Sequence, residues 1–294
     1  MENPSKIKAG SILKLLLKIT VTIICFWYIS QKINFQEMIL AIQQAKAGWI
    51  ALAVFCFMMG KLIFASIRLN IYFKNIGLQL TFLQNAKLYW LGMFYNLFLP
   101  GSISGDAYKV ILLSKNKYAS YKKLTAAVLL DRISGLLALG LFLSLFAIFV
   151  INNPTYDIMI AAFAVLSVVT LYIVVRFFLK DFLTGFFPTF LWGIIVQLMM
   201  IFTLYSIMLA LNLSLLQSEW IFIFLVASVI SVLPISLGGG LGTRELIFLE
   251  GAKYFNLDVH IAIVISLLFY LTNVFSSLGG LYFVFNNPLK NNNT

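Results

Sequence analysis

The chain has 294 residues, of which 62% are hydrophobic and only 11% charged, with a mean hydropathy of +0.98. A soluble domain carries about a quarter charged residues, so the composition excludes an ordinary soluble protein and indicates an integral membrane protein. The formal net charge is +11, which in a membrane protein indicates basic cytoplasmic loops, so we expect no nucleic-acid partner.

Eight apolar segments follow one another, each near the roughly 20 residues that a membrane-spanning helix needs. Two carry charge only near their ends: 12–30, with Lys14 and Lys18, and 48–67, with Lys61, whose long stem we expect to reach the headgroups. No sustained alternation of apolar and polar residues indicates barrel strands, so we expect an all-α fold. The other six segments lack Asp, Glu, Lys and Arg: 88–105, 133–156, 158–175, 182–218, 220–243 and 259–289.

The distribution of Lys and Arg predicts the topology. If all eight segments crossed the membrane, 8 basic residues would lie in the cytoplasm and 10 outside, which violates the positive-inside rule. If the third and seventh segments enter and return on the same side, the counts become 15 inside and 3 outside. We therefore predict about six full transmembrane helices and two re-entrant helical hairpins, with both termini cytoplasmic in the cell (inner) membrane.

Matching breaks occur at the expected hairpin tips, "LPGSISGDAYKVILL" at 99–113 and "LPISLGGGLGTRELIFL" at 233–249, with Pro100 and Pro234 separated by 134 residues. The two halves of the chain have the same order of segments, but the first half starts on the cytoplasmic side of the membrane and the second half on the outer side. The sequence thus predicts one membrane domain, 1–294, built as an inverted repeat of halves 12–150 and 156–285. Such repeats are common in transporters, with the substrate site at their interface.

A helix is expected to restart after each break, with Ser104 and Thr243 as N-caps and Asp106 and Glu245 in the first turn. Helix starts carry free N–H groups and partial positive charge, which suit an anion such as phosphate. Lys109 and Arg244 would add full positive charge beside them. The alternative is that the two acids only cap their helices and the two cations extend to the interface.

A third charged point is "LLDRISG" at 129–135. Arg132 lies nine residues beyond Lys123, about 13 Å along a helix, which is deep in a membrane core about 30 Å thick. Asp131 and Arg132 are adjacent and point about 100° apart, so we expect each to pair with a different element. A structural ion pair and a contact to substrate are both consistent with this pattern.

The candidate substrate-binding residues share positions at the two breaks or at this charged point: Ser102, Ser104, Asp106, Lys109, Asp131, Arg132, Ser236, Thr243, Arg244 and Glu245. We predict no catalytic residue, metal or cofactor, because no protease, hydrolase, nucleotide-binding or metal-binding pattern is found. The single histidine, His260, is interpreted as an interface residue, and Cys25 and Cys56 as packing residues.

Three segments carry a resemblance to a known family: "NLFLPGSISGDAYKVILL" (96–113), "AAVLLDRISGLLAL" (126–139) and "LPISLGGGLGTRELIFLEG" (233–251). In this order the chain resembles, over essentially its whole length, the flippase-like transmembrane domain of lysylphosphatidylglycerol synthases. The aminoacyl-transferring domain of the full synthases has no counterpart in this sequence. The resemblance therefore implies lipid translocation or handling, and enzyme activity is not expected.

The favoured hypothesis is movement of a phosphate-bearing phospholipid, or of an isoprenoid phosphate, between leaflets, with its headgroup between the two tips. Two alternatives remain open: a transporter of a small soluble anion, and an accessory or transferase subunit in envelope-glycan synthesis or lipid modification. Besides the lipid, the partners considered are a second copy of the chain in a homodimer and an envelope-biosynthesis enzyme.

The charge distribution predicts that residues 114–123 face the cytoplasm. In a background in which Cys25 and Cys56 are replaced, single cysteines at Ser114 and Ser120 should react with an impermeant thiol reagent only after the cells are permeabilised. Labelling of both positions in intact cells would contradict the hairpin arrangement.

Overall fold

The computed structural model describes residues 35–98, 103–115, 118–232 and 240–289, together with the isolated positions 20, 23, 27 and 31. Within these ranges the fold is entirely helical, without a β-strand, which confirms the predicted all-α class. Both Leu-Pro pairs, with Pro100 and Pro234, lie outside the described residues, as does the expected first span, 12–30, apart from the isolated positions 20, 23 and 27.

The described helices follow in chain order, with η marking π or 3₁₀ segments. They are α2 (Phe35–Gln44), α3 (Ala47–Met58), η1 (Met59–Phe64), α4 (Ala65–Asn75), α5 (Phe82–Phe98), α6 (Ser104–Lys115), α7 (Tyr121–Ile151), α8 (Pro154–Phe178), η2 (Lys180–Gly185), α9 (Phe186–Ala210), α10 (Ser218–Val232), α11 (Thr243–Tyr254), α12 (Val259–Leu278), η3 (Gly279–Leu281) and α13 (Tyr282–Phe285).

Five continuous helical stretches among the described residues are long and apolar enough to cross a membrane. The protein is therefore a multi-pass membrane protein in the part that the structure describes. Lipid exposure accounts for the large apolar side chains on its outer surface, above all on α8, where Ile158 and Phe163 are 72% and 70% exposed. The five stretches are Ala47–Asn75, Tyr121–Ile151, Pro154–Phe178, Lys180–Ala210 and Val259–Phe285.

The first of these stretches corrects an expectation from the sequence. The sequence predicts a helix end near residue 67, with Lys61 close to it and Arg68 just beyond it, among the basic residues counted on the cytoplasmic side. The helix runs to Asn75 instead, so Lys61 lies at its middle and Arg68 is buried, only 5% exposed. Hydropathy falls where charged residues begin, but the helix continues because Arg68 is neutralised by Asp131 of α7.

Local sequence explains where the long helices turn. Asn152 ends α7 in the left-handed conformation, with φ of 45°, which asparagine tolerates better than most residues. Asn153 then caps α8, its side chain accepting a hydrogen bond from the Thr155 amide, and Pro154 occupies the first helical position. Asp258 caps α12 by accepting from the amides of His260 and Ile261.

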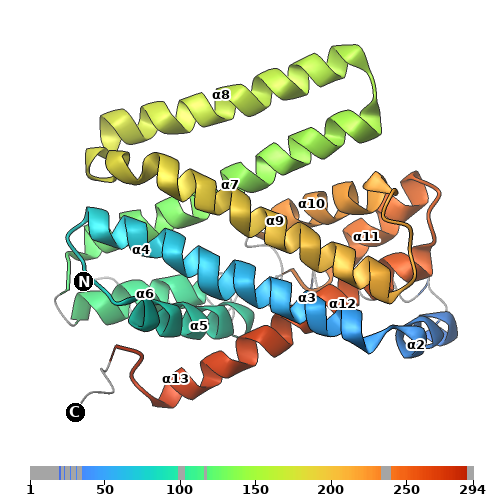
Figure 1. The fold of residues 1–294 in the computed structure, drawn as a ribbon, viewed down its shortest axis with the longest axis horizontal. Helices are drawn as coiled ribbons and strands as arrows, with labels where there is room; N and C mark the ends of the chain where they lie inside the picture. The colour runs from blue at the N-terminus through green and yellow to red at the C-terminus, as the bar shows by residue number, and fades with distance from the viewer. Residues whose placement is uncertain are drawn as a thin grey trace.

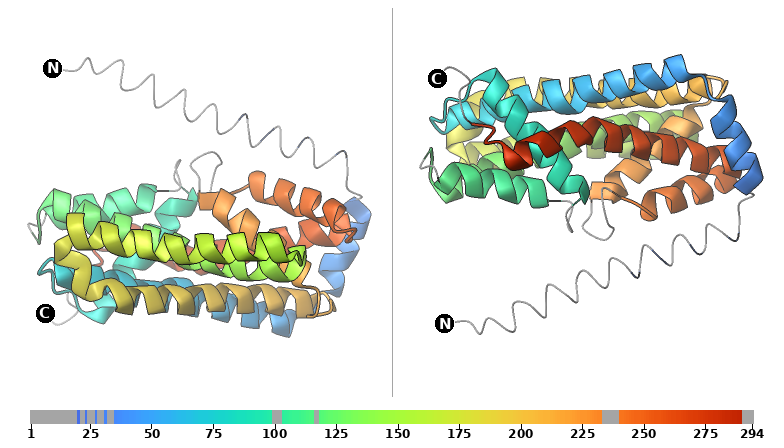
Figure 2. Two further views of the ribbon diagram at one scale, coloured as in Figure 1. Left: turned by 90° about the horizontal axis from the view of Figure 1, so that it is seen from above. Right: turned by 90° about the horizontal axis from the view of Figure 1, so that it is seen from below.

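Two pairs of shorter helices are set among the long ones. In each pair, α5 with α6 and α10 with α11, the two helices contact one another. The α5/α6 pair lies toward one end of the long helices and the α10/α11 pair toward the other, as Figure 1 shows and Figure 2 confirms from two further sides. The buried apolar residues accordingly form two clusters: one joins α10, α11 and α12 to α3 and α9, and the other joins α5 and α6 to α4, α7 and η2.

Helices α5 and α6 meet at a contact that only glycine permits. A Cβ atom placed on Gly105 would lie 2.0 Å from the carbonyl oxygen of Gly92, and one placed on Gly92 would lie 2.3 Å from Cε of Lys109. Since a backbone oxygen cannot move aside as a flexible side chain can, the two glycines bring the helices together and leave a path for the Lys109 stem.

Gly105→Ala should therefore destabilise the protein by about 1–3 kcal/mol, the usual penalty of overpacking. Thermal unfolding of the purified protein in detergent measures the effect. Gly140→Ala in α7 is the matched control, because a Cβ there meets nothing within 4 Å. An equal change in the two variants would show that the contact is not what limits the packing of α5 on α6.

Candidate functional site

A cavity of about 290 Å³ lies among the long helices and both pairs of short helices. It receives residues from every described helix between α3 and α12 except α8 and η2, so the two short-helix pairs meet at one space. Its polar lining residues are Lys61, Arg68, Tyr89, Asn96, Asp106, Lys109, Asp131, Arg132, Gln197, Ser228, Ser231, Arg244 and Asn273. Five of these are cations and two are acids, so the described lining carries an excess of positive charge.

Asp106 holds two of the cations. One carboxylate oxygen, Oδ1, pairs with Nζ of Lys109 at 3.0 Å, within the same helix. The other, Oδ2, accepts a hydrogen bond from Nε of Arg132 in α7. Lys109 is only 2% exposed, and its ammonium lies 3.9 Å from the centre of the Tyr89 ring, in a cation–π contact. The carboxylate of Asp106 thus joins α6 to α7 and fixes both cations at the cavity.

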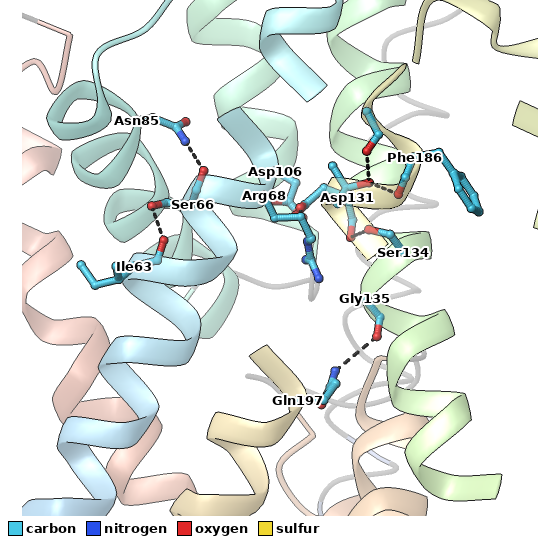
Figure 3. A network of polar contacts seen from close by, with 12 residues as sticks. Ile63, Ser66, Arg68, Asn85, Asp106, Asp131, Ser134, Gly135, Phe186 and Gln197 are labelled. Atoms are coloured by element: carbon cyan, nitrogen blue, oxygen red, sulfur yellow. Dashed lines mark hydrogen bonds and ion pairs between the residues drawn. The ribbon is translucent and has the colours of Figure 1, made fainter. Parts of the chain in front are cut away.

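Arg68 and Asp131 form a second buried ion pair between α4 and α7. Nε of Arg68 lies 2.7 Å from Oδ1 of Asp131, and both side chains are less than 10% exposed. Figure 3 shows the Arg68 side chain directed toward Asp131, with Asp106 close by. Nη1 of Arg68 is buried and has no hydrogen-bond partner within the described residues. The pairing of Asp131 and Arg132 with two different elements is as the sequence predicts.

Neutral side chains tie the same helices together around the cavity (Figure 3). The amide of Asn85 in α5 donates to the carbonyl of Ser66 in α4 at 2.5 Å, and the amide of Gln197 in α9 donates to the carbonyl of Gly135 in α7 at 3.2 Å. These bonds fix the relative positions of the helices that carry the ion pairs.

Arg244 and Lys61 have no carboxylate partner in the described part of the chain. Arg244, only 4% exposed, has its guanidinium carbon 4.2 Å from the centre of the Phe269 ring, and its buried Nε has no hydrogen-bond partner among the residues that the structure describes. Lys61 enters the cavity from η1, a single π-helical turn between α3 and α4. Both groups are positioned to receive an anion, because an unmatched buried charge is costly.

The start of α11 differs from the expected cap. Thr243 was expected to be the N-cap, but Gly242 holds that position with φ of 85°, a conformation that favours glycine. Glu245 supplies the capping oxygen: its Oε2 accepts from the Gly242 amide at 2.7 Å, while Oε1 accepts from the Ser266 hydroxyl at 3.0 Å. The Thr243 hydroxyl donates to the carbonyl of Gly240. Both Glu245 oxygens are therefore occupied by the protein itself.

The start of α6 is held in part by its partner helix. Asn96 of α5 accepts a hydrogen bond from the Gly105 amide at 2.8 Å, so this amide is satisfied by α5. Ser104, the first residue of α6, is half-buried. One of the N–H groups that the sequence would offer to an anion is thus already bonded within the protein.

Of the residues proposed from the sequence, the structure brings five to the cavity: Asp106, Lys109, Asp131, Arg132 and Arg244. Ser104, Thr243 and Glu245 are not among the residues that line it, and Ser102 and Ser236 lie outside the described residues. Lys61, Arg68 and Tyr89 also line the cavity but are not proposed from the sequence. The signal that could have identified Lys61 is a charge in the middle of an apolar helix. The sequence prediction misses it because it places Lys61 near the end of that helix.

No group of three or more His, Cys, Asp or Glu side chains that could hold a metal ion occurs in the described residues. The cavity's two acids are instead each paired with cations. The arrangement suits the binding of an anion by side chains alone, through charge-assisted hydrogen bonds from Arg and Lys.

Comparison with known proteins agrees with the fold. The family described as Lysylphosphatidylglycerol synthase TM region matches residues 15–189, more than half of the 294. A UPF0104 membrane protein of Pyrococcus horikoshii is 25% identical over 173 residues, which cover 58% of this chain and 50% of that relative. The chain thus spans about half the length of the curated relative it matches. The family match includes both ion-pair clusters and ends before Arg244.

The Arg68–Asp131 pair should respond asymmetrically to substitution. Asp131→Leu leaves a buried guanidinium without its partner, so we expect a loss of about 3–5 kcal/mol of stability, whereas adding Arg68→Met should restore most of it. Thermal unfolding in detergent measures both. The exposed pair Lys123–Asp181, with side chains 53% and 52% exposed, is the control. Asp181→Asn should cost about 1 kcal/mol or less. A double variant no more stable than Asp131→Leu would contradict this role.

Proposed function

Because the chain belongs to the lysylphosphatidylglycerol synthase TM region family, we propose that it moves an anionic, phosphate-bearing lipid between the leaflets of the cell membrane. The lipid is a phospholipid or an isoprenoid phosphate, and its headgroup occupies the cavity. The observation that carries the proposal is the excess of buried positive charge at this cavity, where Lys61 and Arg244 have no carboxylate partner among the described residues.

The position of the cavity supports translocation rather than simple binding. A group that crosses a membrane must find polar contacts at depth, and the cavity places them between long apolar helices. We propose that α5/α6 and α10/α11 are re-entrant hairpins that enter from opposite faces, and that the two halves form an inverted repeat. Rocking of one half against the other would then expose the headgroup site to each leaflet in turn.

A small soluble anion would use the same cations but needs no path for acyl chains. Purified protein in liposomes distinguishes the two cases. Accelerated movement of a fluorescent phosphate-bearing lipid from the inner to the outer leaflet, measured by dithionite quenching, supports lipid translocation. Uptake of labelled phosphate without lipid movement would favour the soluble anion. Lipid movement that appears only with a co-purified envelope enzyme would favour an accessory role.

Arg244→Ala should abolish lipid movement while leaving the melting temperature within a few degrees of the parent protein. Arg244→Lys should restore only part of the rate, because lysine keeps the charge but loses the planar fork that binds phosphate in two places. Lys253→Ala, at a partly exposed position of the same helix that does not line the cavity, is the matched control and should leave the rate unchanged. If Arg244→Ala melts far below the parent protein, the residue holds the fold and the site assignment fails.

A further inference from the structure

The cavity's charge balance restricts the kind of phosphate that it accepts. Five cations line it against two acids, Asp106 and Asp131. Glu245 follows Arg244 in the sequence and is also buried, so it adds a third negative charge close to the cavity. The described site therefore carries two or three positive charges in excess. Both acids of the lining are already engaged in ion pairs, so the excess resides mainly on Lys61 and Arg244.

A buried charge needs a counter-charge, because the surrounding protein and lipid cannot solvate it. A phosphodiester headgroup supplies one negative charge and leaves at least one cation uncompensated. A phosphate monoester carries close to two negative charges at neutral pH, and a diphosphate carries at least as many. The charge balance therefore favours a phosphate monoester or a diphosphate over a phosphodiester, a distinction that the size of the cavity alone does not make.

Resting on the function proposed above, we propose that the natural ligand carries a terminal phosphate or a diphosphate, and that Lys61 and Arg244 bind it together. A phosphodiester lipid is then a poor ligand. This assigns to Lys61 a role that the sequence pattern did not indicate, as one of two direct anion ligands.

The geometry of the two residues supports a shared ligand. The guanidinium carbon of Arg244 lies 4.2 Å from the centre of the Phe269 ring, and its buried Nε has no hydrogen-bond partner among the described residues, so it is available to an anion. Lys61 reaches the same cavity from the π turn Met59–Phe64. In that turn Gly60 packs closely on α9, where a Cβ would lie 2.6 Å from Cε of Met200. Turns of this kind occur often at functional sites, and here the turn carries the one lysine at the middle of the first long stretch.

Binding to the purified full chain in nanodiscs tests the proposal. The lipid probes are farnesyl phosphate and farnesyl diphosphate against a short-chain phosphatidylglycerol, and the soluble probes are inorganic phosphate and diphosphate against glycerophosphoglycerol. We expect the farnesyl ligands to bind at least about tenfold more tightly than phosphatidylglycerol, the ratio that about 1.4 kcal/mol of preference gives. Equal or tighter binding of phosphatidylglycerol overturns the proposal and leaves lipid translocation standing.

Variants at Lys61 test its role directly. Lys61→Met should weaken the binding of the farnesyl ligands but not of phosphatidylglycerol, because only a terminal phosphate has a second negative charge that loses its partner. The preference for terminal phosphate should therefore fall to less than about threefold. Lys61→Arg should keep the preference, and Lys61→Gln provides a second uncharged variant if the first does not fold. Lys74→Met, at an exposed position of the same helical stretch, is the matched control. An equal loss for both ligand classes overturns the assignment of Lys61.

The remaining outcomes separate the sources of the phosphate. If inorganic diphosphate binds as tightly as farnesyl diphosphate, the charge preference stands and the lipid is excluded, which overturns the function proposed above. If no phosphate ligand binds to the parent protein, both proposals are overturned together.

Discussion

The structure depends on the cost of burying charge away from water. Three ion-pair contacts meet that cost at the centre of the fold, and each one also connects helices or positions a cation. Asp131 holds Arg68 between α7 and α4, and Asp106 holds both Lys109 and Arg132 between α6 and α7. Without these acids the cations could not remain inside the helical bundle. The same contacts that hold α6 and α4 against α7 therefore also create the polar cavity.

Much of the architecture could be predicted from the sequence because hydropathy and turn residues act locally. The length of the apolar segments predicts the long helices. The two Leu-Pro pairs predict that one helix ends and another begins between α5 and α6, and again between α10 and α11. The depth of Arg132 in its segment predicts that it needs a partner. These features follow from a few neighbouring residues, so a single sequence is sufficient to find them.

The failures have a physical reason in common. Hydropathy alone assigns Arg68 to a loop, because its partner, Asp131, lies 63 positions away in the sequence. Lys61 is then assigned to a helix end, because the helix is expected to stop before Arg68. Thr243 is the stronger cap by residue type, yet the positive φ of Gly242 and the carboxylate of Glu245 determine the helix start. Each case depends on tertiary contacts or backbone conformation, which hydropathy and residue preference do not encode.

The π turn between α3 and α4 has a consequence for the phase of the first long stretch. A π-helical turn contains one residue more than an α-helical turn, so the residues before it and after it lie on faces that a regular helix would not align. If Met59–Phe64 kept all its residues but were wound as a regular α-helix, all that follows would be rotated by about 100° relative to α3. Arg68 would then turn away from Asp131 while α3 kept its contact with α9. The alignment of a charged face in α4 with an apolar face in α3 thus depends on one additional residue at Lys61's turn.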